Sequence, residues 1–585
     1  EDLNLEIKSK ELKDFLEVVG KLQLEFSYRL QEYEKIKQTL NIGQVTAMIF
    51  CSLYAYEYLI PHKDYFEKLP YQFDIKEKNS PETVWKAFDK IIKTSRRNSK
   101  KLTEQSIGLA LKFKMIPIMT GEGLTHGLVQ QYKDFQKLVA IKIEILNYQR
   151  NVLESFSFDS CVSYELENGN LKYTNTTYEH DQWAEKNALL LNYWFQIGGK
   201  RLEQSDYIYR IANTGPNLDA NIIALSKAFG IYEQLKQIYG ITEININNIN
   251  LDIFDLAKTI TLSQAHYLKD HIENFEFFLY ESSNRFNALT KLMIYGLSID
   301  QNRMPLTFDW QKNKVKKMSS WIIDGNEYQK KQKMNQIINF WSCDLYDENN
   351  ISSFSEKPFL KIDDIVFQFP WLTAFQNLNT SMINYARKLY KNHETLKEET
   401  DRIEVNLGDK FREAGFEVFT QYIPKHGNAG EIDLIAICGN HVLIAEVKSS
   451  YLRSSIKEIY EYRNFTLRKA AYQLNKKIDY LKSSFLSDYF EKPNEVKIYS
   501  WIIDTSLEFD HEYFDGHLKV SLDEVIIGLT NNQDFWDKFL NSDLSTENNK
   551  FDCLKFLENT ESNTFWTKQL ESQRVYMKRI LNEFR

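Results

Sequence analysis

Three charged residues in the last third of the chain have the types and the spacing of a metal-assisted hydrolysis site. Asp433 lies in the segment GEIDLIAI, and Glu446 and Lys448 follow in the segment HVLIAEVKSS. Carboxylate oxygens are ligands that Mg²⁺ prefers, and a nearby ammonium suits a phosphate oxygen or an attacking water. An ion held there would polarise phosphorus, generate hydroxide and stabilise the leaving oxygen, which is the chemistry of phosphodiester hydrolysis.

A β-hairpin is needed to bring these side chains together. The two segments are joined by Gly439-Asn440, and glycine at the first position of a two-residue loop suits a type II′ turn. The turn pairs each residue with the one whose number brings the sum to 879, so Asp433 is opposite Glu446. Glu431 is likewise opposite Lys448, and all four side chains share one face. Two carboxylates about 5 Å apart repel each other, and a cation or a proton relieves that repulsion.

Predicted elements on both sides of the hairpin complete a small α/β domain. A helical pattern ends near Ala414, and a strand is predicted over 416–423. An amphipathic helix is predicted over 464–485, a strand over 495–504 and a terminal helix over 562–585. This order predicts a mixed sheet with helices packed on it. The hairpin face without charges is expected to pack on a helix, and it consists of Ile432, Leu434, Ala436, Leu443, Ala445 and Val447.

The run GEID followed by EVK resembles the D…(D/E)-x-K signature of the PD-(D/E)xK nuclease superfamily, whose fold is restriction-endonuclease-like. It is especially similar to the Holliday-junction-resolvase-like branch, and the resemblance covers about residues 400–505. The resemblance implies that Asp433, Glu446 and the backbone carbonyl of Val447 bind Mg²⁺ or Mn²⁺. It also implies that Lys448 assists the attacking water.

The flanking helices extend the resemblance. Glu404 matches the acidic residue of the family's first helix, and Gln473 matches the glutamine of the Q-x-x-x-Y helix in related nucleases. The resemblance implies that both lie around the metal site as further catalytic residues. Two positions depart from the pattern: Ile432 replaces the leading proline of the signature, and Lys477 stands where the helix motif has tyrosine.

Three residues are candidates for binding the substrate. Lys469 and Lys477 lie four residues before and after Gln473, so on a helix they share an edge where they could contact backbone phosphates. Glu431 is either an outer ligand of the metal site or the salt-bridge partner of Lys448, and the second role is slightly favoured.

The rest of the chain predicts a multidomain α+β protein. Residues 1–350 are mainly helical in pattern and form one or two domains for binding a substrate or partner, or for regulation. The polar segment 241–252 is expected to be a loop between helical layers. Residues 351–398 predict a β-hairpin turning at Asp363-Asp364 and a connecting helix. Residues 399–585 predict the restriction-endonuclease-like α/β domain with its mixed central sheet and C-terminal helices.

The composition of the chain limits how it can interact with nucleic acid, metal ions and membranes. The formal net charge is −8, so nucleic acid would have to be bound by local basic patches. The five cysteines never form a CxxC pair, and they are expected to be reduced in a cytoplasmic protein rather than to form disulfides or a zinc site. The most apolar run, 45–60, is interrupted by polar residues and is too short for a membrane span, so no membrane association is expected.

Two functions are consistent with these patterns. The first is a metal-dependent endo- or exodeoxyribonuclease, whose combination with a helical region is similar to bacterial restriction or anti-phage defence effectors. DNA is favoured over RNA because the branch it resembles acts mostly on DNA. The helical region would then bind a protein partner or a second copy of the chain. The alternative is a non-catalytic subunit that binds nucleic acid or a partner through a nuclease-like fold.

Overall fold

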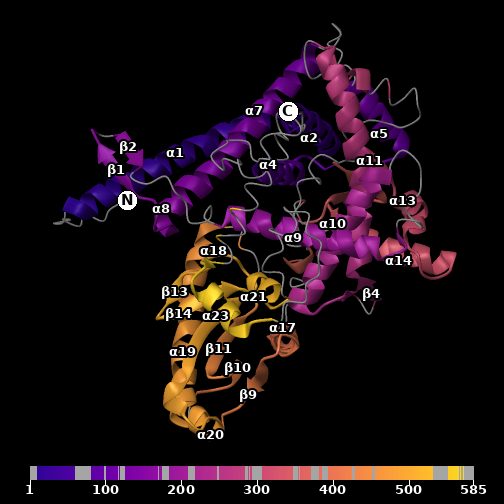
Figure 1. The fold of residues 1–585 in the computed structure, drawn as a ribbon. Helices are drawn as coiled ribbons and strands as arrows, with labels where there is room; N and C mark the ends of the chain where they lie inside the picture. Colours follow the sequence, from indigo (N-terminus) through magenta and orange to yellow (C-terminus); the bar gives the residue numbers. More distant parts are fainter. Residues whose placement is uncertain are drawn as a thin grey trace. The chain divides into compact units, whose positions relative to one another are not determined.

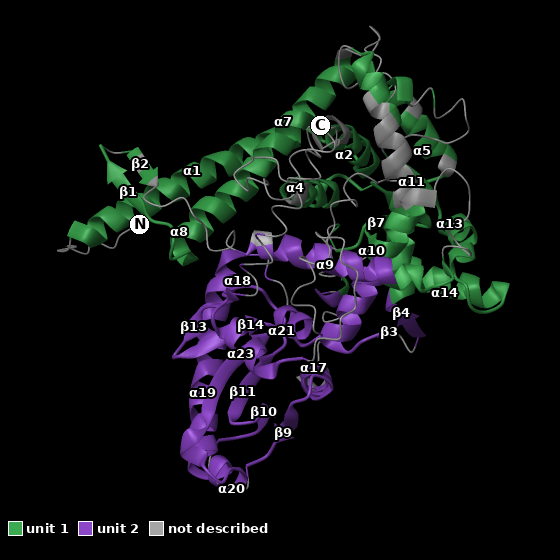
Figure 2. Cartoon of the chain, in the orientation of Figure 1, with its two compact units in different colours: residues 1–179, 201–228, 254–382 green, residues 180–200, 229–253, 383–585 purple. Residues whose placement is uncertain are grey.

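The computed structural model divides the chain into two compact units (Figure 2). Unit 1 comprises Glu1–Glu179, Arg201–Ala228 and Phe254–Met382, and unit 2 comprises His180–Lys200, Phe229–Ile253 and Ile383–Arg585. The division differs from the predicted boundaries because two segments from the helical first half belong to unit 2. Apart from isolated positions, the structure describes residues 10–59, 81–97, 101–115, 126–168, 170–173, 183–207, 218–246, 249–282, 306–346, 356–369, 393–424, 429–450, 455–530 and 551–564.

The fold is mixed α and β, with a helical N-terminal region and mixed sheets in the C-terminal half, as predicted at that level (Figure 1). Two helices, α10 (Leu218–Tyr239) and α11 (Ile253–Tyr280), cross the boundaries between the units. The main elements of unit 1 are α1 (Lys10–Leu40), α2 (Gln44–Leu59), α4 (Pro81–Thr94), α5 (Glu104–Ala110), α7 (His126–Tyr148), α8 (Ser155–Phe158), β1 (Tyr164–Glu167), β2 (Asn170–Tyr173), β5 (Thr307–Trp310), α13 (Gln311–Met318), α14 (Glu327–Phe340), β6 (Ser342–Asp344), β7 (Phe359–Ile362) and β8 (Ile365–Gln368).

The core of unit 1 is built on the apolar run that forms α2. Ile49, Phe50 and Leu53 are fully buried. The Phe50 ring makes edge-to-face contacts with Tyr132 and Phe135 of α7. Such contacts between aromatic rings add to the free energy gained from burial. Of the helices that the structure describes, none is both long enough and apolar enough to cross a lipid bilayer.

The predicted hairpin of residues 351–398 is confirmed. β7 and β8 pair antiparallel with Ile362 opposite Ile365, so the turn lies at Asp363-Asp364. Asp363 adopts a φ of +54°, a conformation that aspartate tolerates better than most residues. The hairpin is part of a four-stranded sheet in the order β5-β8-β7-β6.

Unit 2 contains a six-stranded mixed sheet in the order β13-β14-β12-β11-β10-β9. β10 is antiparallel to β9 and β11, whereas β12 is parallel to β11 and β14. The elements of unit 2 are α9 (Ala184–Glu203, whose last turn falls in unit 1), β3 (Glu243–Ile246), β4 (Ile249–Asp252), α17 (His393–Glu413), β9 (Glu417–Tyr422), β10 (Ile432–Cys438), β11 (His441–Lys448), α18 (Ile456–Glu461), η8 (Tyr462–Leu467), α19 (Arg468–Tyr480), η9 (Leu481–Phe485), α20 (Leu486–Tyr489), β12 (Lys497–Asp504), β13 (Tyr513–Phe514), β14 (His517–Ser521), α21 (Leu522–Leu529) and α23 (Cys553–Glu561).

The register predicted for the central hairpin is confirmed. Cys438 pairs with His441 and Leu434 with Ala445, and both pairs sum to 879. Gly439 has a φ of +54°, which the first position of a type II′ turn requires and which glycine adopts without steric cost. The turn therefore sets which face of the sheet receives each charged side chain.

Helices pack against both faces of the hairpin, although a helix was expected only on the uncharged face. The buried stripe of α19, including Ala470 and Leu474, belongs to one core with Ile435 and Ile444, which lie on the same sheet face as Asp433 and Glu446. α17 approaches β9 so closely that a Cβ at Gly408 would clash with Cγ2 of Thr420. Asp433 and Glu446 are therefore buried beneath α19 and are not on an open sheet surface.

Two predictions about unit 2 are wrong. The segment 241–252 is the hairpin β3–β4, because its apolar residues alternate and bury Ile244 and Leu251. Cys438 and Cys553 form a disulfide with Cα atoms 6.5 Å apart, whereas Cys51, Cys161 and Cys343 are not disulfide-bonded. Their separation of 115 residues gave no sign that the two segments would adjoin. The predicted terminal helix over 562–585 lies almost entirely outside the described residues.

Candidate functional site

Asp433 and Glu446 lie on adjacent strands, on the face of the sheet that α19 covers. They occupy the position after the pair formed by Leu434 and Ala445, so the hairpin register brings them together as predicted. Asp433 Oδ2 accepts a hydrogen bond from the backbone N–H of Val447 at 2.8 Å. Both acidic residues are buried, so their charges need partners inside the protein.

Lys477 supplies that partner from α19. Its Nζ lies 2.7 Å from Asp433 Oδ1 and forms an ion pair with Glu446 Oε2. The whole residue is only 3% exposed. The prediction that Lys477 lies at the helix edge is therefore wrong, and its predicted contact with phosphates stays a prediction. On α19 its position turns it toward the sheet rather than toward solvent, and the two buried carboxylates attract its ammonium.

Lys448 is the second cation of the group. Its Nζ pairs with the other oxygen of Glu446, Oε1, and its side chain is 26% exposed, far more than that of Lys477. Glu431, the partner slightly favoured from the sequence, is exposed and precedes the first residue of β10. Lys448 therefore adjoins both the buried carboxylates and the solvent. We call Asp433, Glu446, Lys448 and Lys477 the 433/446 cluster.

Burial and neighbouring charges shift the pKa values of Asp433 and Lys477 in the 433/446 cluster. Burial, followed by the charge of Glu446, raises the pKa of Asp433 despite the opposing effect of Lys477. Burial lowers the pKa of Lys477, but the two carboxylates outweigh it and raise that pKa above its ordinary value. Lys477 is therefore charged near neutral pH, and the site still favours additional positive charge.

Glu404 on α17 belongs to the same electrostatic environment. Burial, followed by the charge of Asp433, raises the pKa of Glu404 to about 8, with smaller contributions from Asp401 and Glu431. A side-chain hydrogen bond with Gln421 acts in the opposite direction. The structure thus brings Glu404 near the carboxylates, as predicted, and favours its protonated form near neutral pH.

Gln473 and Lys469 lie on α19, one and two turns before Lys477. Gln473 Oε1 is buried and, among the described residues, has no hydrogen-bond partner. An acceptor left unpaired in this way is costly unless a water, an ion or a ligand contacts it. Lys469 is exposed to solvent, so its predicted contact with substrate stays a prediction.

The donor atoms of the 433/446 cluster fit a hard divalent ion. Oxygens of Asp433 and Glu446 converge on one point, and Mg²⁺ commonly binds through one or two carboxylates with waters completing its shell. Gln473 Oε1 is a further oxygen acceptor on the same face of α19. The ammonium of Lys477 lies at the point of convergence.

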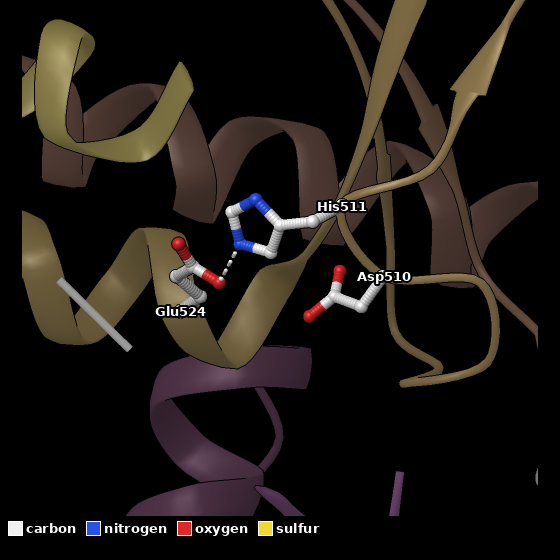
Figure 3. A group of neighbouring side chains, drawn as sticks. All are labelled: Asp510, His511 and Glu524. Carbon is white, nitrogen blue, oxygen red and sulfur yellow. Dashed lines mark hydrogen bonds and ion pairs between the residues drawn. The ribbon is translucent and has the colours of Figure 1, made fainter. Parts of the chain in front are cut away.

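A second cluster of charges lies elsewhere in unit 2 and was not predicted. Asp510, His511 and Glu524 have potential ligand atoms within 4.8 Å of one another (Figure 3). Figure 3 shows the His511 ring directed at Glu524, and Nε2 lies 2.8 Å from Glu524 Oε2. Two lysines pair with the same carboxylates. We call these five residues, Lys186, Asp510, His511, Lys519 and Glu524, the 510/524 cluster.

The carboxylates of the 510/524 cluster pair with lysines inside the protein, although Glu524 Oε1 and His511 Nδ1 are buried with no hydrogen-bond partner among the described residues. Lys186 of α9 pairs with Asp510 and lies 2.7 Å from Glu524 Oε2, while Lys519 Nζ lies 3.3 Å from Asp510 Oδ1. Burial raises the pKa of Asp510, but Lys186 and then Lys519 outweigh it and hold that pKa well below its usual range. Lys186 thus connects α9 to Asp510 in the segment between β12 and β13 and to Glu524 of α21.

Sequence reasoning missed the inward direction of Lys477 and the whole 510/524 cluster. Lys477 sits three residues after buried Leu474, and that helical spacing could have placed it on the buried face of α19. No comparable signal existed for Lys186, which precedes Asp510 by 324 residues. Searches of protein-family models, curated proteins and solved structures found no match to this chain.

Proposed function

We propose that unit 2 is a metal-dependent phosphodiesterase of the PD-(D/E)xK type that hydrolyses nucleic acid, with DNA as the favoured substrate. One observation carries the proposal: the carboxylates of Asp433 and Glu446 converge on a single cation position, and the ammonium of Lys448 lies beside it. The strand order around the hairpin and the nearby Glu404 support it further.

The residues have distinct roles in this proposal. Asp433, Glu446 and the backbone carbonyl of Val447 would hold Mg²⁺ or Mn²⁺. When bound, the ion would supply a Lewis acid for the phosphate and lower the pKa of an attacking water. Lys448, which is partly exposed, would orient that water or a phosphate oxygen. Gln473 would donate or accept a hydrogen bond at the same face.

A cleavage assay with a matched pair of lysine variants tests the proposal. The purified chain is incubated with single-stranded, double-stranded and branched DNA, and with RNA, in the presence of Mg²⁺ or Mn²⁺. Lys448→Ala should abolish cleavage, whereas Lys492→Ala, which removes an exposed lysine paired with Glu495, should leave it unchanged. Circular dichroism shows that each variant is folded. Equal behaviour of wild type and Lys448→Ala on every substrate would contradict the proposal.

A non-catalytic module is the second candidate, and Lys477 favours it. This ammonium already pairs with both carboxylates, so each has a cationic partner without a metal ion. In that case unit 2 would bind nucleic acid or a protein partner without cutting it. Binding of DNA at an unchanged affinity with and without Mg²⁺, together with no cleavage, would favour this second function.

A further inference from the structure

The position of Lys477 bears on how the candidate metal site is filled. Its ammonium is the only group that contacts an oxygen of both Asp433 and Glu446 in the described structure, at 2.7 Å from Asp433 Oδ1 and in an ion pair with Glu446 Oε2. A divalent ion bound by these same oxygens would lie about 2.1 Å from each. The ion and the ammonium would therefore need the same space.

The side chain of Lys477 can leave that space without a change of fold. Only its four-carbon chain extends from α19 to the carboxylates, and rotation about its bonds moves the ammonium while the helix stays packed on the sheet. Lys448 on β11 remains next to Glu446 in either case, because it pairs with the other oxygen. The exchange would thus replace one positive charge with two at the same pair of acids.

The charge around the 433/446 cluster favours such an exchange. Asp433 and Glu446 together carry two negative charges at the shared cation position, where Lys477 supplies one positive charge and a divalent ion would supply two. The 510/524 cluster differs, because Lys186 and Lys519 are buried and both pair with Asp510. An ammonium between two carboxylates can therefore be a fixed part of the fold or a cation that a metal ion displaces. The charges and burial of the neighbouring groups determine which of these applies.

We propose that Lys477 competes with the divalent ion: it occupies the ion's position in the metal-free protein and must withdraw before the ion can bind. The proposal rests on the proposed function, since it concerns the same metal site. The proposal predicts that the wild-type site binds metal more weakly than the same two carboxylates would without Lys477. The stronger the ion pairs of Lys477, the higher the metal concentration that is needed to fill the site.

Metal binding by a charge-removing variant tests this competition. Free Mn²⁺ is measured by its EPR signal during titration of wild type, Lys477→Met and the control Lys476→Met, which changes the exposed neighbour on the same helix. Lys477→Met should bind Mn²⁺ at least tenfold more tightly than wild type, and Lys476→Met should match wild type. Adding Asp433→Asn to Lys477→Met should remove the gain, which locates the ion at this site.

The outcomes separate this inference from the proposed function. If wild type and Lys477→Met both bind no Mn²⁺, the proposed metal-dependent function fails and the competition fails with it. If both bind equally, or if Lys477→Met binds more weakly, only the competition is refuted. Mn²⁺ binding that survives Asp433→Asn would place the ion elsewhere and would also refute it.

A second measurement uses the wild-type chain and does not depend on the variant folding. Acetic anhydride labels accessible amines, and mass spectrometry gives the rate of labelling at each lysine. Saturating Mg²⁺ should increase labelling of Lys477 several-fold, because the displaced ammonium loses its buried partners. Lys519, which is buried and bonded to the carbonyl of Ser506, serves as the internal control and should not change. Equal labelling of Lys477 with and without Mg²⁺ would overturn the proposal.

Discussion

The 433/446 cluster and the 510/524 cluster contain the same kinds of groups but differ in electrostatic balance. Each holds two buried carboxylates and two lysines, with one ammonium contacting both acids. At the first cluster, burial and the charge of Glu446 raise the pKa of Asp433. At the second, Lys186 and Lys519 overcome the effect of burial and lower the pKa of Asp510. Two clusters with similar ion pairs therefore shift the pKa of a buried aspartate in opposite directions.

The difference follows from where the lysines lie. Lys519 is fully buried and additionally donates to the carbonyl of Ser506, so its ammonium is fixed within the fold. Lys448 is partly exposed, and its ammonium adjoins solvent. A buried carboxylate whose lysine partner reaches solvent is a candidate for binding a metal ion or substrate, whereas one whose lysine partners are all buried mainly stabilises the fold. The variants below compare the two clusters.

The largest expected effect is on hydrolysis, from the pair Asp433→Asn and Asp510→Asn. Asp433→Asn removes a proposed metal ligand, so we expect the cleavage rate to fall about a thousandfold or more, the equivalent of about 4 kcal/mol of transition-state stabilisation. Asp510→Asn should leave the rate per folded molecule unchanged. The rates are measured with Mg²⁺ on the best substrate. A similar loss in both variants would remove the functional distinction between the clusters.

The next effect is on stability, from Lys186→Met. This change leaves Asp510 and Glu524 buried with one fewer cation, and breaking a buried ion pair costs about 3–5 kcal/mol. The free energy of unfolding is measured with urea, with and without Mn²⁺ or Zn²⁺. We expect no recovery of stability with metal. Recovery would show that Asp510, His511 and Glu524 can bind an ion once the lysine is gone, and it would weaken the contrast between the clusters.

The sequence predicted the hairpin that holds the candidate site because local rules determine it. Gly439 fixes the turn, and the alternation of the two strands then fixes the face of each side chain, so the meeting of Asp433 and Glu446 follows without knowledge of the fold. Contacts between distant segments could not be predicted in this way. Lys186 pairs with Glu524, and Cys438 is disulfide-bonded to Cys553. Both contacts join segments that are far apart in the sequence, so they depend on how the whole unit packs.

The interpretation of α19 was limited for a related reason. Helical spacing correctly identified its buried stripe, but a lysine in the sequence is normally expected to face solvent. Lys477 is buried because two carboxylates on the sheet attract it, and those partners become visible only when α19 is placed over the hairpin. The resemblance to a nuclease motif likewise indicated which residue types form the candidate site. It did not show which cation lies between Asp433 and Glu446.

A smaller effect is the pH dependence of stability that Glu404 contributes. Its pKa is raised from 4.5 to about 8 in the folded protein, mainly by burial and then by Asp433. The folded state therefore binds more protons than the unfolded state between these values, and the free energy of unfolding falls as the pH rises through that range, by up to a few kcal/mol. Asp510, whose pKa is lowered, acts oppositely: the stability it contributes is lost as the pH falls below about 4.

Urea unfolding at pH 5.5 and pH 8.5 measures the contribution of Glu404. Wild type should lose stability between these two values, and Glu404→Gln, which cannot ionise, should lose less. Asp510→Asn serves as the matched control, because its effect is confined to more acidic conditions and its slope between pH 5.5 and 8.5 should equal that of wild type. An unchanged slope in Glu404→Gln would show that the proton is taken up elsewhere.

The smallest expected effect is the stabilisation of the wild-type chain by Mg²⁺. A ligand that binds only the folded state at ten times its Kd raises the free energy of unfolding by about 1.4 kcal/mol. We expect this gain in wild type and in Asp510→Asn, but not in Asp433→Asn, when urea unfolding is compared with and without Mg²⁺. The size of the gain at a fixed Mg²⁺ concentration should grow in Lys477→Met, because that variant offers the carboxylates without a competing ammonium. An equal gain in Asp433→Asn would mean that the ion stabilises another part of the chain, and the 433/446 cluster would then be an ion-pair network of the same structural kind as the 510/524 cluster.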